Sequence, residues 1–408
     1  MKYIILVGDG MGDLPLPELE DRTPLEAANT TAMDYLCQHG ELFRLKTIPA
    51  GMHPGSDIAN LSLLGYEPQH FYTGRAPLEA ASMGIDLAED ETAYRCNLVT
   101  LKKNVDGSLT MVDFSAGNIP TAESSVLIKD LQDELGSDWF HFYPGISYRH
   151  LMVSQNSLPN LETVPPHDYI GQDVTEFWKR YQQYPELQLL LESACKLLEK
   201  HQVNKQRIER GLLSANGIWL WGEGKAPTIP TIKEQFGLQG SLISAVDLLK
   251  GIGSYGGLEI INVEGATGNL DTNYAGKAAA ALQALTEQDF VLVHLEAPDE
   301  AGHQGNVRDK VRAIENFDSK IVKPIVEGLQ SMEGAPDFRL VVCMDHFTPI
   351  STRTHSDNPV PVLLYDSRQQ GSGSGLSYTE ANGEKSNTLL PSGRFFLNKL
   401  LERDTQTP

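Results

Sequence analysis

Three continuous apolar segments of this sequence each lead into side chains that bind metal ions. The segments are residues 3–8, 290–295 and 340–344, and the side chains after them are Asp9, Asp299, His303, Asp345, His346 and His355. Such segments predict strands buried on both faces of a parallel sheet. Open parallel sheets place active sites beyond the carboxyl ends of their strands. We therefore expect these residues to meet at one sheet edge, and six ligands predict a two-metal centre.

The local setting of each ligand leaves a structural alternative open. Asp9 lies between Gly8 and Gly10, which allow a tight turn and a close ligand, although a turn aspartate often only bonds its own backbone. Asp299 and His303 are four residues apart and would share one face of a helix. A cap aspartate beside an exposed histidine is the alternative interpretation of that pair.

Asp345 and His346 are neighbours and would point to opposite faces of a continuing strand. Both reach one ion only if the strand ends there, and Thr348-Pro349 favours that ending. Mixed carboxylate and imidazole ligands suit Mn²⁺ or Zn²⁺ better than Ca²⁺.

Ser56 opens a predicted helix after Gly55. Serine is a favoured N-cap residue, so a purely structural role explains its position. A hydroxyl at a helix N-terminus also lies near free N–H groups that favour an attacking alkoxide and a phosphate. A metal ion on its oxygen would lower its pKa further. The sequence alone leaves both interpretations open.

Basic residues in polar segments are candidates for binding an anion. Arg75, Arg149 and Lys225 follow or precede glycine- and tyrosine-containing motifs, and arginine binds phosphate and carboxylate with two parallel hydrogen bonds. A surface charge or a structural ion pair is the more common role for each. The chain has neither a GxxxxGK[ST] loop nor a GxGxxG after a strand, so no motif supports a nucleotide site.

The composition limits the classes of partner. The 408 residues carry a net charge of -21, which argues against nucleic acid as a partner and suits a protein that binds divalent cations. The 4 cysteines are scattered, which argues against a disulfide framework or a thiolate metal site. We see no signal sequence and no membrane-spanning apolar run, so we expect a cytoplasmic enzyme. An anionic substrate would need a local basic pocket against the negative charge of the whole chain.

The order of elements predicts one α/β domain that is interrupted and then resumed. Residues 1–92 form its first part, with strand and helix patterns. Residues 93–179 contain a hairpin signal at Asn104–Gly107, a helix and a return strand, which predict a smaller inserted α+β domain. Residues 180–408 resume the α/β pattern, including an apolar segment at 218–221.

Several motifs together resemble the archaeal-type cofactor-independent phosphoglycerate mutases of the alkaline phosphatase superfamily. These motifs are Gly8–Met11, Arg22–Ala28, Pro54–Tyr66, Tyr72–Ala80, Arg95–Thr100, Ser147–His150, Pro298–His303, and Asp345 and His346 with His355. The resemblance implies an alkaline-phosphatase-like core with a mostly parallel sheet flanked by helices. It also implies interconversion of 3-phosphoglycerate and 2-phosphoglycerate through a phosphoserine, without 2,3-bisphosphoglycerate.

The resemblance assigns roles by matching position. One ion would be held by Asp9, Ser56, Asp345 and His346, and the other by Asp299, His303 and His355. Mn²⁺ is the expected metal, with Zn²⁺, Co²⁺ or Mg²⁺ as alternatives. Arg149 would bind the substrate, and Arg75 and Lys225 match more weakly.

Other activities could use the same centre. A bacterial subgroup with this pattern has been proposed to be an alternative homoserine kinase, so phosphoryl transfer to homoserine is the principal alternative. A metal-dependent phosphatase or sulfatase would release the anion instead, and Ser56 lacks the CxPxR setting typical of a sulfatase. A metal-binding protein without enzymatic activity is the last alternative.

Overall fold

The computed structural model describes residues 1–155, 158, 161–369 and 373–403, and the chain divides into two units. The first unit comprises Met1–Tyr72 and Thr228–Pro408, and the second comprises Thr73–Pro227. The second unit is therefore wider than the insertion expected at 93–179.

The difference has a physical reason in strand pairing. Strand β7 (Gly217–Gly224) contains the apolar segment that we expected in the resumed core, but it pairs antiparallel with β3 (Glu91–Lys103) of the second unit. Helix α5 (Arg75–Ser82) also packs against β3 and β7.

The first unit is built on an eight-stranded sheet in the order β13-β2-β12-β11-β1-β10-β8-β9. Its strands are β1 (Lys2–Gly8), β2 (Glu41–Leu45), β8 (Gly240–Ile243), β9 (Glu259–Ile260), β10 (Phe290–Leu295), β11 (Phe338–Cys343), β12 (Val360–Asp366) and β13 (Leu389–Leu390). Only β12 runs antiparallel to its neighbours β11 and β2. The expected mostly parallel sheet is confirmed.

The register of the central strands brings the expected ligands to one edge. Strand β1 lies between β10 and β11, with Gly8 opposite Leu295 and Val7 opposite Cys343. All residues of β10 and β11 are buried, which explains their unbroken apolar sequences. Asp9 and Asp345 therefore leave the sheet at the same end, where β10 also ends.

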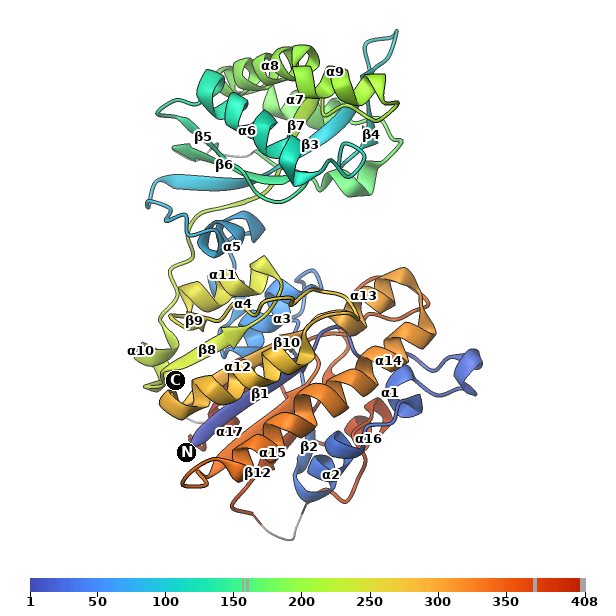
Figure 1. The fold of residues 1–408 in the computed structure, drawn as a ribbon, viewed down its shortest axis with the longest axis vertical. Helices are drawn as coiled ribbons and strands as arrows, with labels where there is room; N and C mark the ends of the chain where they lie inside the picture. The colour runs from blue at the N-terminus through green and yellow to red at the C-terminus, as the bar shows by residue number, and fades with distance from the viewer. Residues whose placement is uncertain (156–157, 159–160, 370–372, 404–408) are drawn as a thin grey trace. The chain divides into compact units, whose positions relative to one another are not determined.

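Helices cover both faces of this sheet (Figure 1). The helices of the first unit are α1 (Pro24–Ala27), α2 (Thr31–His39), α3 (Ser56–Leu63), α4 (Pro68–Phe71), α10 (Ile232–Phe236), α11 (Asp247–Tyr255), α12 (Tyr274–Glu287), α13 (Ala297–Gln304), α14 (Val307–Phe317), α15 (Lys323–Ser331), α16 (Glu380–Lys385) and α17 (Gly393–Leu400). Helix α12 packs on β10, β8 and α15, whereas α3 packs against α11 and α17.

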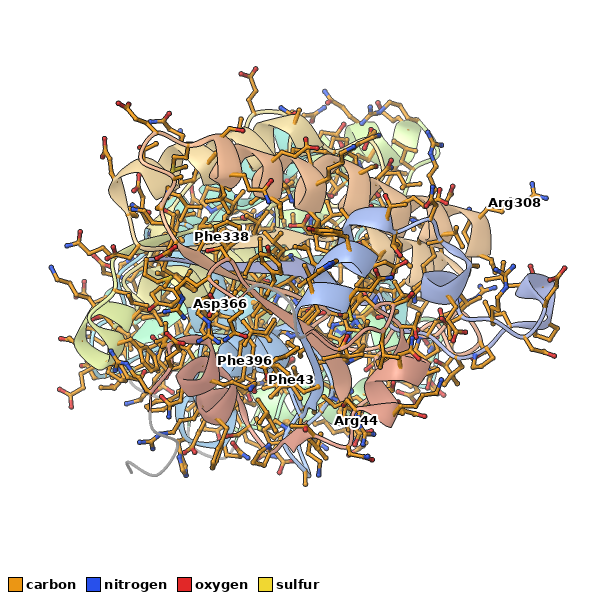
Figure 2. All side chains as sticks on the ribbon, turned by 90° about the horizontal axis from the view of Figure 1, so that it is seen from below. Phe43, Arg44, Arg308, Phe338, Asp366 and Phe396 are labelled. Atoms are coloured by element: carbon orange, nitrogen blue, oxygen red, sulfur yellow. The ribbon has the colours of Figure 1, made fainter. Side chains whose placement is uncertain are left out.

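Aromatic side chains from the strands and helices fill the core between these layers. Phe43 of β2, Phe338 of β11 and Phe396 of α17, labelled in Figure 2, are each at most 3% exposed. None of the helices in the described ranges combines the length and the hydropathy that crossing a bilayer requires.

The second unit has a five-stranded antiparallel sheet with helices packed on it. The remaining elements are β4 (Leu109–Asp113), β5 (Phe140–Tyr143), β6 (Arg149–Gln155), α6 (Thr121–Leu135), α7 (Thr175–Tyr181), α8 (Pro185–Lys200) and α9 (Gln202–Glu209). Strand β3 is the centre, because β4, β6 and β7 all pair with it. Its core includes the fully buried Trp219 and Tyr181.

The close approach of α17 to α3 leads to a prediction about the stability of the fold. A Cβ atom added at Gly393 would lie 1.6 Å from the carbonyl oxygen of Ser62, so the two helices would have to separate. We expect Gly393→Ala to destabilise the fold by about 1–3 kcal/mol, measured by urea or thermal unfolding.

Gly268→Ala is the matched control, because a Cβ atom added there would lie an ordinary 3.8 Å from the nearest side-chain atom. Equal stability of the two variants would contradict the packing that we describe.

Candidate metal centre

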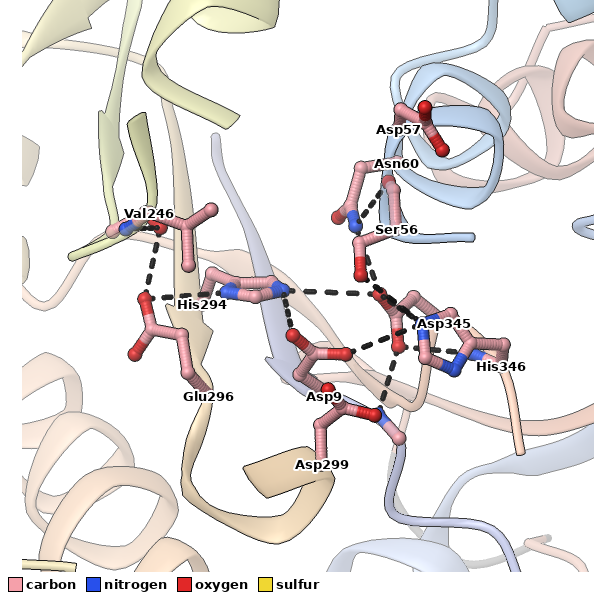
Figure 3. Close-up of polar contacts among 12 residues, drawn as sticks. Asp9, Ser56, Asp57, Asn60, Val246, His294, Glu296, Asp299, Asp345 and His346 are labelled. Carbon is pink, nitrogen blue, oxygen red and sulfur yellow. Dashed lines mark hydrogen bonds and ion pairs between the residues drawn. The ribbon is translucent and has the colours of Figure 1, made fainter. Parts of the chain in front are cut away.

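Three acidic residues from separate segments converge beyond the ends of β1, β10 and β11 (Figure 3). Asp9 follows β1, Asp345 follows β11, and Asp299 lies in α13 after β10. Nε2 of His346 lies 3.4 Å from Oδ1 of Asp9 and 3.6 Å from Oδ2 of Asp345. Because β11 ends at Cys343, both Asp345 and His346 face the same site.

The glycine after Asp9 makes this convergence possible. Gly10 has a φ of +55°, and a Cβ atom there would lie 2.4 Å from Oδ1 of Asp299. Its N–H donates to Oδ1 of Asp345 at 3.0 Å. A larger residue at this position would separate the loop after β1 from both carboxylates.

The second group of expected ligands surrounds Asp299. His303, one helical turn further along α13, places Nε2 3.1 Å from Oδ2 of Asp299, and Nε2 of His355 lies 3.5 Å from Oδ1. The two histidine Nε2 atoms are 3.0 Å apart. The helix and the polar loop thus bring His355 from a distant part of the sequence to Asp299 and His303.

The Ser56 hydroxyl lies beside the first group of ligands. Gly55 occupies the N-cap position of α3, so Ser56 is the first helical residue and not the N-cap. Its Oγ instead lies 3.1 Å from Nε2 of His346. The half-buried hydroxyl therefore faces the ligands from the N-terminal end of a helix, where positive backbone charge is concentrated.

Two side chains that we did not single out from the sequence complete the environment. Asn60, one turn after Ser56, donates through Nδ2 to Oδ2 of Asp345 at 2.9 Å. Thr348 donates to Oδ1 of Asp299 at 2.5 Å and lies 3.2 Å from Nδ1 of His346. The helical spacing of Asn60 from Ser56 was the available signal, whereas nothing in the sequence distinguished Thr348.

The electrostatics of the site combine buried carboxylates with neighbouring histidine rings. Burial, and after it the negative charges of Asp345, Asp299 and Glu296, raise the pKa of Asp9 well above its usual value. Burial also opposes ionisation of Asp345, but the rings of His346 and His294 hold the pKa of that carboxyl below its usual value. Buried carboxylates of this kind require a compensating cation.

The donor atoms form two groups that fit divalent metal ions. One ligand atom from each of Asp9, Asp345 and His346 lies within 4.8 Å of the others, and the same holds for Asp299, His346 and His355. Oδ1 of Asp9 is buried and has no hydrogen-bond partner among the described residues. A buried, unpartnered carboxylate oxygen beside other ligand atoms fits a metal ligand.

The second unit contains its own cluster of cations. Arg95 lies 4.0 Å above the Trp221 ring, and its Nε is 3.1 Å from Oε2 of Glu79. Burial lowers the pKa of Arg95, and the charges of Arg75 and Arg149 lower it further. Arg75 and Arg149, two of the expected anion-binding residues, thus lie near Arg95. We had named Arg95 only as the first residue of the motif Arg95–Thr100.

Two of the three expected substrate contacts are exposed. Arg149, at the start of β6, is exposed and lies 5.5 Å from the Tyr148 ring centre. Lys225 is also exposed, and its ammonium donates to the carbonyl oxygen of Glu89 at 3.0 Å.

Comparison with known proteins identifies similar sequences. A family model described as 2,3-bisphosphoglycerate-independent phosphoglycerate mutase matches residues 37–204. A Geobacter sulfurreducens protein named probable 2,3-bisphosphoglycerate-independent phosphoglycerate mutase is 46% identical over 403 residues, which cover 99% of this chain and 100% of the relative. The enzyme of that name from Methanosarcina barkeri is 47% identical, covering 94% of this chain and 95% of its own length.

Solved structures agree with these sequence relatives. A Pyrococcus horikoshii protein has a TM-score of 0.81 and 27% identity, covering 100% of this chain and 99% of that one. The cofactor-independent phosphoglycerate mutase of Thermoplasma acidophilum has a TM-score of 0.66 and 27% identity, with 98% and 99% coverage.

The protonation of His303 predicts that metal binding releases a proton. The hydrogen bond to Asp299 raises the pKa of His303 to about 9 against the opposing effect of burial. At pH 7.5 the metal-free protein therefore holds this proton, and an ion that binds Nε2 must displace it.

Titration calorimetry with Mn²⁺ in buffers of different ionisation enthalpy should detect release of at least about one proton, and His303→Asn should release about one fewer. Equal release by wild type and variant would contradict a role for His303 as a ligand.

Proposed function

The chain belongs to the family of 2,3-bisphosphoglycerate-independent phosphoglycerate mutases, and from this premise we propose that it interconverts 3-phosphoglycerate and 2-phosphoglycerate through a phosphoserine at Ser56. The observation that carries the proposal is the position of Oγ of Ser56, 3.1 Å from His346 and beside the buried carboxylates. A nucleophile next to a site for divalent cations is what phosphoryl transfer to serine requires.

Two divalent ions fit the donor groups. Asp9, Ser56, Asp345 and His346 would hold one ion, and Asp299, His303 and His355 the other. When bound, the ions would neutralise the carboxylates and stabilise the charge of the transferring phosphoryl group. Mn²⁺ is the metal that we propose, with Zn²⁺, Co²⁺ or Mg²⁺ as alternatives, because the donors are oxygen and imidazole without thiolate.

The bond changes balance without a second phosphate donor. Oγ of Ser56 attacks phosphorus and loses its proton, while the bond from phosphorus to O3 of glycerate breaks and O3 takes up a proton. The 2-hydroxyl of the same glycerate then attacks the phosphorus of the phosphoserine and loses its proton, while the bond from phosphorus to Oγ breaks and Oγ takes up a proton. The N-terminal end of α3, where the positive end of the helix dipole lies, favours the negative charge at Oγ in both steps.

The second unit would supply contacts to the anionic groups of the substrate. We propose that Arg149, Arg75 and Lys225 bind its carboxylate or phosphate, because arginine forms paired, charge-assisted hydrogen bonds with both groups. Arg95 would keep its positive charge beside them while Glu79 and Trp221 fix its orientation. A small phosphorylated acid is therefore the substrate class, and a cytoplasmic place in glycolysis or gluconeogenesis is the role that we propose.

Phosphorus NMR tests this function directly. The purified protein with Mn²⁺ and 3-phosphoglycerate, without ATP and without 2,3-bisphosphoglycerate, should produce 2-phosphoglycerate and little free phosphate. Free phosphate alone would indicate a phosphatase. If nothing changes until ATP and homoserine are added, the protein is a homoserine phosphotransferase and the mutase proposal is wrong.

Removal of the nucleophile should abolish turnover but spare metal binding. Ser56→Ala keeps the other proposed ligands of its ion, so we expect Mn²⁺ content close to wild type and a fall in kcat of about a thousandfold or more. Ser62→Ala on the same helix, whose hydroxyl donates to the Thr47 carbonyl, is the matched control and should retain activity. Normal kcat in Ser56→Ala would disprove the nucleophile assignment.

Loss of a proposed substrate contact should lower kcat/KM without changing metal binding. Arg149→Gln removes a charge-assisted contact, so we expect kcat/KM to fall by about 10- to 100-fold with Mn²⁺ binding unchanged. Arg210→Gln, from an arginine of the same unit that pairs with Glu123 at 2.6 Å, should change kcat/KM little. A similar loss in both variants would show a general effect of positive charge instead of a specific contact.

A further inference from the structure

A fully buried histidine lies directly behind the metal ligand Asp9 and was not among the expected ligands. His294, in strand β10, is 0% exposed. Its Nε2 lies 3.4 Å from Oδ2 of Asp9, and its Nδ1 lies 3.4 Å from Oε1 of Glu296 (Figure 3). The same Nε2 is 3.8 Å from Oδ2 of Asp345, so one ring nitrogen faces two expected ligands and the other faces Glu296. Neither nitrogen makes a hydrogen bond within the described residues, so these contacts are ion pairs of a buried ring.

The carboxylate on the far side of the ring is rigidly held. Oε1 of Glu296 accepts from the Ser244 hydroxyl at 2.9 Å and from the Ala245 N–H at 2.6 Å. Oε2 accepts from Nζ of Lys277 at 2.6 Å. Burial alone would raise the pKa of Glu296, but His294 and Lys277 hold it at about 2.

Lys277 is itself fully buried and donates to the backbone carbonyl of His294 at 2.8 Å. Burying a lysine is costly unless it is paired and hydrogen-bonded, and here its contacts fix both the carboxylate and the strand that carries the ring. The contacts join helix α12, the loop after β8 and the end of β10 into one support for a single imidazole.

The two oxygens of Asp9 face different partners. Oδ2 faces His294, whereas Oδ1 lies 3.4 Å from Nε2 of His346 and has no hydrogen-bond partner. The contact between His294 and Oδ2 thus leaves Oδ1 of Asp9 as the oxygen that faces His346. Partners that orient a metal-binding side chain from behind commonly change metal affinity by about 10- to 100-fold.

We propose that His294, held by Glu296 and Lys277, is a positioning residue that fixes Oδ2 of Asp9 and thereby presents Oδ1 to one metal ion. The inference rests on the proposed two-metal function. It adds a connected support, Lys277–Glu296–His294, behind one ligand of one ion, and it predicts that the other ion does not depend on this support.

A matched pair of substitutions tests the proposal through metal binding. The amide of glutamine reaches about as far as Nε2 of histidine, whereas that of asparagine reaches only about as far as Nδ1. We expect His294→Asn to weaken the binding of one of two Mn²⁺ ions by about 10- to 100-fold in equilibrium dialysis. His294→Gln should lose less affinity than His294→Asn, because it keeps a donor toward Asp9 although it loses the contact with Glu296. The second ion should bind both variants normally.

Other results would overturn the inference. Equal loss in both variants would show that the ring itself binds metal, and wild-type affinity in both would show that it has no role in binding. Failure of both metal-free variants to unfold cooperatively on heating would mean that the ring serves the fold. If wild-type protein binds no Mn²⁺ at all, the proposed function fails, which is a distinct result from equal binding by wild type and variants.

A double-mutant cycle tests the connection to the support. The double variant Glu296→Ala, Lys277→Met removes both charges of the pair together and should weaken the same ion as His294→Asn. Combining all three substitutions should weaken it little further, because they interrupt one series of contacts. Fully additive losses would contradict the proposed support.

Discussion

Three buried carboxylates that meet at one edge of the sheet are the constraint on which this structure depends. The parallel pairing of β1 with β10 and β11 brings Asp9, Asp299 and Asp345 to this edge. Burial and the neighbouring carboxylates raise the pKa of Asp9, whereas histidines hold the pKa values of Asp299 and Asp345 below their usual values despite burial. Divalent ions would compensate the carboxylate charge, and in the function that we propose the same ions would support phosphoryl transfer to Ser56.

The strands provide rigidity, and the short segments after them provide chemistry. Buried strands position the start of each loop, and the first helical turns place the side chains within hydrogen-bonding distance of one another. Ser56 at the first position of α3 and Asp299 in the first turn of α13 both follow this arrangement. Active-site side chains held by such scaffolds keep their geometry because the supporting core cannot easily rearrange.

Much of the first unit could be predicted because its signals are local. The strand before Asp9 and the strand before Asp345 have unbroken apolar sequences, and the i, i+4 spacing of Asp299 and His303 lies on a helix as expected. Pairing partners are not local, so the segment at 218–221 was placed in the wrong unit although it is a strand. His294 was overlooked because one polar residue in an apolar strand gives no sign of which carboxylates it will face.

The central claim is that the ligands bind two metal ions, and anomalous diffraction tests it most directly. Crystals grown with Mn²⁺ should show two anomalous peaks, one among Asp9, Ser56, Asp345 and His346 and one among Asp299, His303 and His355. A single peak, or peaks away from these residues, would contradict the two-metal centre.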